Sequence, residues 1–148
     1  MKVLLDSAPL GILTNPKPSD LTLECRLWVE SLWSKNYKVI LPEIVDYEVR
    51  RELLRANKLA GIRRLNEFKA RLEYLPLNTA MILQAAEFWA EARRQGIPTA
   101  APKALDGDVI LAAQAQVINT DDERVVIATT NVKHLSRFVN AREWQDIE

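Results

Sequence analysis

Short apolar runs alternate along the chain with stretches in which apolar residues recur every three or four positions. The runs at 2–5, 37–41 and 125–128 have the length and composition of buried strands. Helical spacing occupies the longer stretches between and after them, at 20–35, 43–56, 58–71, 79–95 and 105–118. This alternation predicts an α/β fold with a mainly parallel sheet and helices packed against it.

Turn and capping residues set the expected ends of these elements. Pro42 is placed for the first position of helix 43–56, and Asn78 or Thr79 for the cap of helix 79–95, which Gly96 ends. The same helix is expected to turn Met81, Ala85, Phe88, Trp89 and Ala92 toward the core. A proline-containing loop is expected at 97–103, and further short strands at 74–77 and within 138–147.

Length and composition indicate one folded domain spanning 1–148, since 148 residues with 48% hydrophobic and 27% charged residues are typical of a globular protein. Twenty basic and twenty acidic residues cancel, so a nucleic-acid partner would need a local basic patch.

Cys25 is the only cysteine, which excludes an intrachain disulfide and fits a reducing compartment. No apolar run reaches the length of a signal peptide or membrane span, so we expect a cytoplasmic protein.

Acidic residues stand at the predicted ends of several elements. Asp6 follows strand 2–5, Glu48 lies on helix 43–56, and Asp106 and Asp108 lie at the beginning of helix 105–118. Ligands of parallel α/β sheets gather outside the carboxyl ends of the strands, which is where Asp6 and Asn131 are expected. Carboxylates about 4 Å apart repel by about 4 kcal/mol at an effective dielectric of 20, so a cluster is costly unless a cation or protons compensate. Oxygen ligands favour Mg²⁺ or Mn²⁺, and the single histidine argues against zinc.

Each acidic position also has a purely structural interpretation. Glu48 can pair with Arg51, and Asp106 is a natural N-cap, with Asp108 as a favourable anion in the first helical turn. Asn131 suits the N-cap of the helix that follows the last buried strand. Asp108, however, shares a face with three apolar positions, and a carboxylate on a buried face requires a partner.

Four segments form an ordered set of motifs: Val3-Leu4-Leu5-Asp6, the stretch from Pro42 to Leu53, the stretch from Asp108 to Ala115, and the stretch from Thr129 to Leu135. Taken together and in order, they resemble the motifs of PIN-domain nucleases, and the likeness is greatest to compact VapC-type toxins of toxin–antitoxin pairs. The resemblance implies a PIN-like three-layer sandwich with an acidic Mg²⁺ or Mn²⁺ site that cuts RNA. Asn131 stands where the family often has aspartate, and Ser7 and Ala8 stand where it often has threonine and asparagine.

The expected function is therefore that of a metal-dependent endoribonuclease, with a small antitoxin protein covering the acidic groove. Its expected catalytic residues are Asp6, Glu48, Asp108 and Asn131, and its expected metal ligands are Asp6, Glu48, Asp106 and Asp108. Basic residues on two consecutive helices form either a solvated face or an RNA-binding patch: Arg50, Arg51, Arg55, Lys58, Arg63, Arg64, Lys69 and Arg71. A homodimer through apolar surface on helices 20–35 and 43–56 and around Trp89 is possible.

Two other functions remain open at this point. A PIN-like binding scaffold without catalysis is one, and Asn131 is the feature that favours it. A phosphoryl-receiver module is the other, because receivers also place acidic residues at the carboxyl edge of a doubly wound sheet, although Asp6 follows the first strand and is an awkward acceptor.

Overall fold

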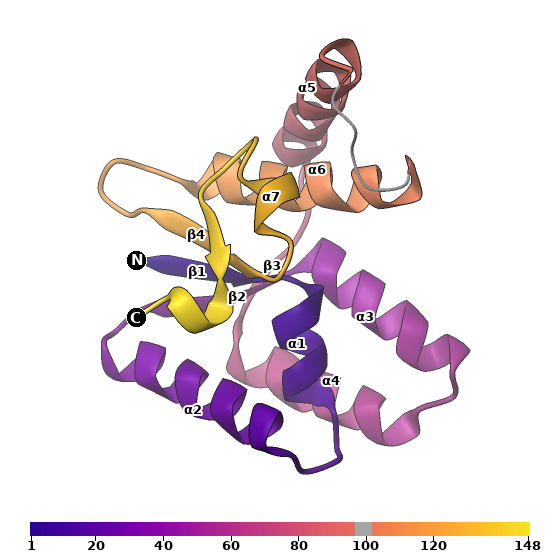
Figure 1. Cartoon of the computed structure of the whole chain (residues 1–148), viewed down its shortest axis with the longest axis vertical. Coiled ribbons are helices and arrows are strands. Elements are labelled where there is room, and N and C mark those ends of the chain that lie inside the picture. Colours follow the sequence, from indigo (N-terminus) through magenta and orange to yellow (C-terminus); the bar gives the residue numbers. More distant parts are fainter. Residues whose placement is uncertain (97–101) are drawn as a thin grey trace.

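The computed structural model describes residues 1–96 and 102–148, which form a parallel sheet with helices around it (Figure 1). The strands are β1 (Lys2–Leu5), β2 (Lys38–Pro42), β3 (Glu73–Leu75), β4 (Val125–Thr129) and β5 (Ala141–Glu143). The helices are α1 (Ser7–Thr14), α2 (Asp20–Ser34), α3 (Glu43–Arg55), α4 (Leu59–Arg71), α5 (Thr79–Arg94), α6 (Pro102–Ile118), α7 (Val132–Leu135) and a final 3₁₀ turn, η1 (Trp144–Asp146). The predicted α/β sandwich is confirmed.

The sheet has the strand order β3-β2-β1-β4-β5, and every pairing within it is parallel. Its central strand β1 is buried from Val3 to Leu5, as expected for a strand covered on both faces. In the register, Leu5 lies beside Ala128 of β4, and the backbone N–H of Asp6 continues the ladder by donating to the Ala128 carbonyl at 2.9 Å. The carboxyl ends of β1 and β4 therefore finish at the same level.

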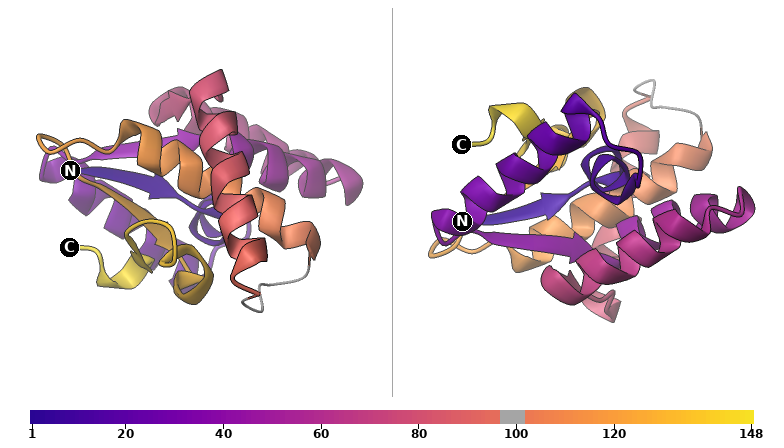
Figure 2. Two further views of the ribbon diagram at one scale, coloured as in Figure 1. Left: turned by 90° about the horizontal axis from the view of Figure 1, so that it is seen from above. Right: turned by 90° about the horizontal axis from the view of Figure 1, so that it is seen from below.

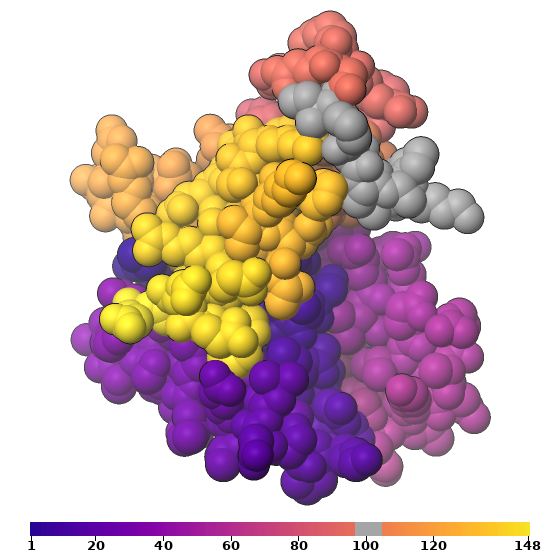
Figure 3. All heavy atoms as spheres, viewed as in Figure 1, coloured from indigo at the N-terminus to yellow at the C-terminus, as the bar shows by residue number. Residues whose placement is uncertain are grey.

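Helices cover both faces of the sheet, with α6 on one face and α2 on the other (Figure 2). Below the sheet, Trp28 of α2 meets Trp144 edge to face at 5.4 Å, and its indole N–H donates to the Ile147 carbonyl at 2.9 Å. These contacts attach the C-terminal turn to the core. Helix α5 packs on α6 and projects from the rest of the surface, as Figures 1 and 3 show.

Helix α1 is an element that the apolar pattern did not predict. Its eight residues include Pro9 and Gly11, which obscure the helical periodicity. Pro9 is nevertheless tolerated because it lies in the first turn, where the backbone N–H groups have no intrahelical partner. The side chain of Asp6 caps this helix by accepting a hydrogen bond from the Ser7 backbone N–H at 2.7 Å. A helix that Asp6 caps therefore follows β1 directly.

Three other boundary and burial predictions were wrong. Pro42 ends β2 and occupies the N-cap of α3 instead of its first turn. Helix α6 begins at Pro102, earlier than expected, since proline is well suited to a first helical position. Trp89 is 39% exposed, because it lies at the edge of the buried face of α5, whose centre carries Met81, Ala85 and Ala92 and packs on α6. The predicted loop at 97–103 lies largely outside the described residues.

Asn78 caps α5 with its side chain, and Gly96 follows the helix at a positive φ of 61°, as the sequence predicted. Within the described ranges, no helix combines the length and the apolar character that a membrane crossing requires.

Candidate active site

Asp6 is held in a defined orientation at the carboxyl edge of the sheet. Its Oδ1 accepts from the Ser7 backbone N–H, and its Oδ2 accepts from the Thr129 hydroxyl, both at 2.7 Å. Thr129 is fully buried at the end of β4, and its Oγ1 also accepts from the backbone N–H of Asn131 at 2.8 Å. The hydroxyl group therefore joins Asp6 to the loop that carries Asn131.

Glu48 reaches the same edge from α3. Its Oε2 lies 2.8 Å from the position that a Cβ would occupy on Gly107 of α6. The missing side chain of this glycine therefore provides the space that the Glu48 carboxylate occupies. Burial, followed by the negative charge of Asp6, raises the pKa of Glu48; Arg51 opposes this shift and Asp108 adds to it. The predicted interaction with Arg51 is thus electrostatic, and the Arg51 guanidinium itself lies over the Tyr47 ring at 5.0 Å.

Asp108 completes a group of three carboxylates from β1, α3 and α6. It is half-buried, and burial together with the charge of Asp6 raises the pKa of Asp108 to about 6. Because Asp6 and Asp108 both act on the pKa of Glu48, the three groups share one electrostatic environment. The structure therefore brings together Asp6, Glu48 and Asp108.

Asp106 and Asn131 differ from what the sequence predicted. Asp106 is exposed and lies inside α6, so it is not the N-cap, and Asp108 is beyond the first turn, because the helix begins at Pro102. Residues two positions apart on a helix do not face each other, which separates Asp106 from Asp108. Asn131 occupies the N-cap position of α7, but its side chain makes no capping hydrogen bond there.

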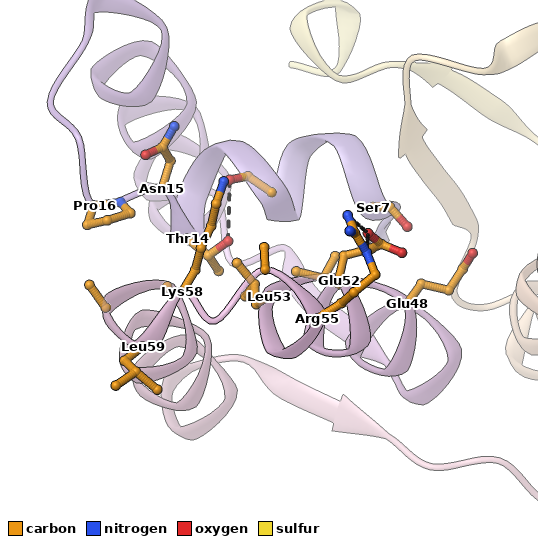
Figure 4. Close-up of a pocket in the computed structure, with 15 residues that line it drawn as sticks. Ser7, Thr14, Asn15, Pro16, Glu48, Glu52, Leu53, Arg55, Lys58 and Leu59 are labelled. Carbon is orange, nitrogen blue, oxygen red and sulfur yellow. Dashed lines mark hydrogen bonds and ion pairs between the residues drawn. The ribbon is translucent and has the colours of Figure 1, made fainter.

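A groove of about 660 Å³ leads away from the carboxylates between α1, α3 and the start of α4. Figure 4 shows Ser7 and Glu48 at one end and Asn15, Pro16 and Leu59 at the other. Apolar side chains and glycines form much of the lining, while Glu52 and Arg55 pair with each other at 2.8 Å on its wall. An extended segment entering this groove would end beside Glu48.

Sequence comparison decides the family. A sequence model of the PIN domain matches residues 7–138 of the chain, which is most of its length. The chain belongs to the PIN domain family. The resemblance noticed in four short motifs is thereby confirmed. Comparison with curated proteins found no match.

Solved structures similar to this PIN domain include three VapBC assemblies. VapBC-1 from nontypeable Haemophilus influenzae matches with a TM-score of 0.72 and 20% identity over 99% of this chain and 100% of that one. VapBC2 from Rickettsia felis, bound to a DNA fragment from its promoter, matches with a TM-score of 0.74 and 19% identity over 97% and 99%. DNA-bound VapBC from Salmonella typhimurium matches with a TM-score of 0.64 and 23% identity over 97% and 98%. At these identities the likeness establishes the fold.

In this PIN domain, two residues of the acidic edge were not singled out from the sequence. Thr129 orients Asp6, and a threonine ending an otherwise apolar strand is the pattern that would have indicated it. Gly107 makes space for Glu48, and a glycine inside a helix costs about 1 kcal/mol relative to alanine, which calls for a packing reason. Both residues act by positioning a carboxylate.

The residues of the acidic edge fit a hard divalent cation by their chemistry, since three carboxylates supply oxygen donors and negative charge. Across residues 1–96 and 102–148, no three histidine, cysteine, aspartate or glutamate side chains form a ready-made metal cage. Mg²⁺ commonly uses only one or two carboxylates and keeps several of its waters, so an open arrangement also suits it.

Proposed function

We propose that this PIN domain is a Mg²⁺- or Mn²⁺-dependent endoribonuclease that hydrolyses RNA phosphodiester bonds. The observation that carries the proposal is the convergence of Asp6, Glu48 and Asp108, where burial and then the neighbouring negative charges raise the pKa of Glu48 and of Asp108. Carboxylates gathered in this way gain most from a bound cation. The PIN family membership favours nuclease chemistry over a phosphoryl receiver.

The three carboxylates differ in how firmly the surrounding structure orients them. Asp6 is the most firmly oriented, because two hydrogen bonds hold its oxygens, and Glu48 and Asp108 approach from helices on either side. Together they would hold the cation, and Asp106 remains a predicted ligand whose exposed side chain lies on another part of α6. When bound, the cation neutralises charge that develops on the phosphate and makes water more acidic.

Hydrolysis then requires a water oriented in line with the breaking bond. A carboxylate of this group that is not fully engaged, or the amide of Asn131, is proposed to orient that water. The water releases a proton to solvent as its oxygen bonds to phosphorus, and the bond from phosphorus to the 3′-oxygen breaks. The 3′-oxygen takes up a proton, leaving a 3′-hydroxyl and a 5′-phosphate.

The test is cleavage of single-stranded RNA by the purified chain with Mg²⁺ or Mn²⁺, with excess EDTA as the metal-free reference. We expect cleavage only with metal, and none in the Asp6→Asn variant. Glu30→Gln, which removes a negative charge at an exposed position of α2, is the matched control and should cleave normally. Calorimetric titration separates a scaffold from an enzyme: absence of Mg²⁺ and Mn²⁺ binding would leave a scaffold.

We further propose that the chain is the toxin of a toxin–antitoxin pair, with a segment of a small antitoxin protein in the groove beside Glu48. The groove has an apolar lining and an acidic end, so the expected segment carries apolar side chains and one basic residue. The VapBC structures with this fold support such a partner. A neighbouring reading frame encoding a short DNA-binding protein, whose product blocks RNA cleavage when mixed with this chain, is the expected finding.

A homodimer is proposed through the exposed face of α5. Ile82, Leu83 and Trp89 are 47%, 64% and 39% exposed on a helix that stands out from the body. Ile82, Ala86 and Trp89 follow a spacing of four and three residues, which places them on one stripe. Sedimentation of the wild type should show a dimer, and Ile82→Lys a monomer; a wild-type monomer throughout would refute it.

A further inference from the structure

The basic residues of α3 and α4 differ in whether the structure already uses them. Arg50 binds Asp46 through two hydrogen bonds of 3.0 Å each, and Arg55 pairs with Glu52 at 2.8 Å. These side chains stabilise the helices they stand on, which makes them weaker candidates for binding a partner.

A second group of basic residues lines a furrow, which we define as three hollows that share lining residues and that include the groove beside Glu48. Asn15 and Pro16 belong both to that groove and to a hollow of about 470 Å³ lined by Lys17, Arg26 and Arg64. Arg26 and Arg64 also line a third hollow, of about 280 Å³, which Arg71 closes. Three adjoining hollows thus connect the acidic edge to the far end of α4.

The charges of this furrow differ from those of the whole chain. Its two outer hollows contain four basic residues, Lys17, Arg26, Arg64 and Arg71, and two acidic ones, Asp20 and Glu67. The excess of two positive charges contrasts with a formal net charge of zero for the chain. In the described ranges none of the ion pairs includes these four basic residues.

The arginines of the furrow are suited to a phosphate backbone. Arg26 and Arg64 are half-buried, which limits the freedom of the side chains before any partner binds. A guanidinium group binds phosphate oxygens through two parallel hydrogen bonds, a geometry that lysine lacks. Arg71 lies over the Trp33 ring at 5.2 Å and the Phe68 ring at 5.9 Å, and these cation–π contacts hold its planar cation at the end of the furrow.

We propose that the furrow lined by Lys17, Arg26, Arg64 and Arg71 binds the sugar-phosphate backbone of the RNA strand away from the scissile bond. The inference rests on the proposed nuclease function and specifies where its substrate runs. From Gly61 in the groove to Arg71, α4 rises by about 15 Å, so the furrow reaches nucleotides well beyond the one that is cut. Long RNA should therefore bind better than a short phosphodiester.

The first measurement is the binding of a labelled, mixed-sequence single-stranded RNA at several salt concentrations, in an Asp108→Asn background that prevents cleavage. Adding Arg26→Ala and Arg64→Ala should weaken binding roughly tenfold. It should also reduce the slope of log K against log salt by about 1.4, since each single-strand phosphate contact contributes about 0.7. The control pair is Arg94→Ala with Arg124→Ala, exposed arginines outside the furrow, which should leave both quantities unchanged.

The second measurement compares two substrates in the active chain. For RNA, kcat/KM should fall in the Arg26→Ala, Arg64→Ala variant, while hydrolysis of bis(p-nitrophenyl) phosphate, which is too small to reach the furrow, should not change. An equal loss on both substrates, or unchanged RNA binding, overturns the furrow proposal. If the variant loses binding to polyglutamate while its RNA binding is unchanged, the furrow proposal is also overturned. That result would indicate that the furrow binds an acidic protein segment. A wild type that cleaves neither substrate with metal refutes the nuclease function itself.

Discussion

Carboxylates at the two opposite edges of the sheet have pKa values shifted in opposite directions. At the amino edge, Glu123 lies 3.2 Å from the ammonium group of Lys38 and 3.7 Å from that of Lys2. Desolvation acts to raise its pKa, but the hydrogen bond from Lys38 and the charges of both lysines outweigh it, so the pKa of Glu123 is lowered.

At the carboxyl edge, the pKa of Asp108 rises to about 6 and the pKa of Glu48 rises as well, because burial and neighbouring carboxylates act in the same direction. In the described part of the chain, the ion pairs include neither of these residues nor Asp6. The comparison shows that the sheet can neutralise an acidic residue with lysines. Its carboxyl edge holds negative charge that a ligand can neutralise instead.

Substituting one carboxylate at each edge tests this contrast most strongly. Asp108→Asn should reduce metal-dependent RNA cleavage at least about 100-fold, because a ligand of the cation is lost. Thermal stability without metal should be equal to that of the wild type or higher, since repulsion with Asp6 and Glu48 is relieved. Cleavage assays and melting curves measure the two effects.

Glu123→Gln is the matched control at the amino edge. It should leave cleavage unchanged and lower the melting temperature slightly, by an amount that shrinks with added salt. A large loss of cleavage in this variant would contradict the division between the two edges.

Filling the space beside Glu48 should lower activity without lowering stability. In Gly107→Ala, a new Cβ would lie 2.8 Å from the present position of the Glu48 Oε2, so this flexible carboxylate must move. We expect roughly tenfold slower cleavage, together with a gain of up to about 1 kcal/mol in unfolding free energy from the better helix former. Urea unfolding measures the change in stability, and cleavage rates measure the change in activity. Gly96→Ala is unsuitable as a control because Gly96 has a positive φ.

A gain in stability without loss of activity in Gly107→Ala would show that Glu48 does not need its present position. Ala112→Gly, on the same helix, reverses the substitution at a buried site and should lower stability instead.

Removing the hydroxyl that orients Asp6 should cost both stability and activity. Thr129→Val deprives Asp6 of a 2.7 Å donor and the Asn131 N–H of its acceptor. Loss of one buried hydrogen-bonding group costs about 1–3 kcal/mol of unfolding free energy, and cleavage should fall several-fold. Thr129→Ser, which keeps the hydroxyl, should restore most of the activity; failure to do so would assign the effect to packing.

The smallest expected effect is a pH dependence of the metal-free protein. The folded-state pKa of Asp108, about 6, lies above its ordinary value of 3.8. The contribution of Asp108 to the free energy of unfolding is therefore most favourable below a pH of about 4, and it becomes unfavourable as pH rises through about 6. Melting temperatures measured across this range should decline with pH more in the wild type than in Asp108→Asn.

Adding Mg²⁺ should stabilise the wild type more at pH 7 than at pH 5, because the cation binds the ionised carboxylates. Equal stabilisation at both pH values would argue that these carboxylates do not bind it.

Most of the sheet and the larger helices followed from the sequence because their information is local. The buried runs at β1 and β4 and the spacing of α2, α3 and α4 are visible within single turns or pleats. The errors concern places where a local pattern is weak: α1 contains Pro9 and Gly11, and the beginning of α6 was placed after Pro102. Trp89 was assigned to the core because its apolar character alone does not tell which face of α5 is covered.

By itself, the sequence determined the order of the main strands and the larger helices, and that Asp6 follows the first strand. It also determined that Asp108 lies on an apolar helix face, because the spacing of nearby apolar residues along the chain fixes which residues share a face of the helix. Only the tertiary structure decided that Glu48 lies against Gly107, that Thr129 donates to Asp6 over a separation of 123 residues, and that Asp106 is exposed. These relations depend on how elements distant in the chain pack together, and packing selects among arrangements that a local pattern leaves equally possible.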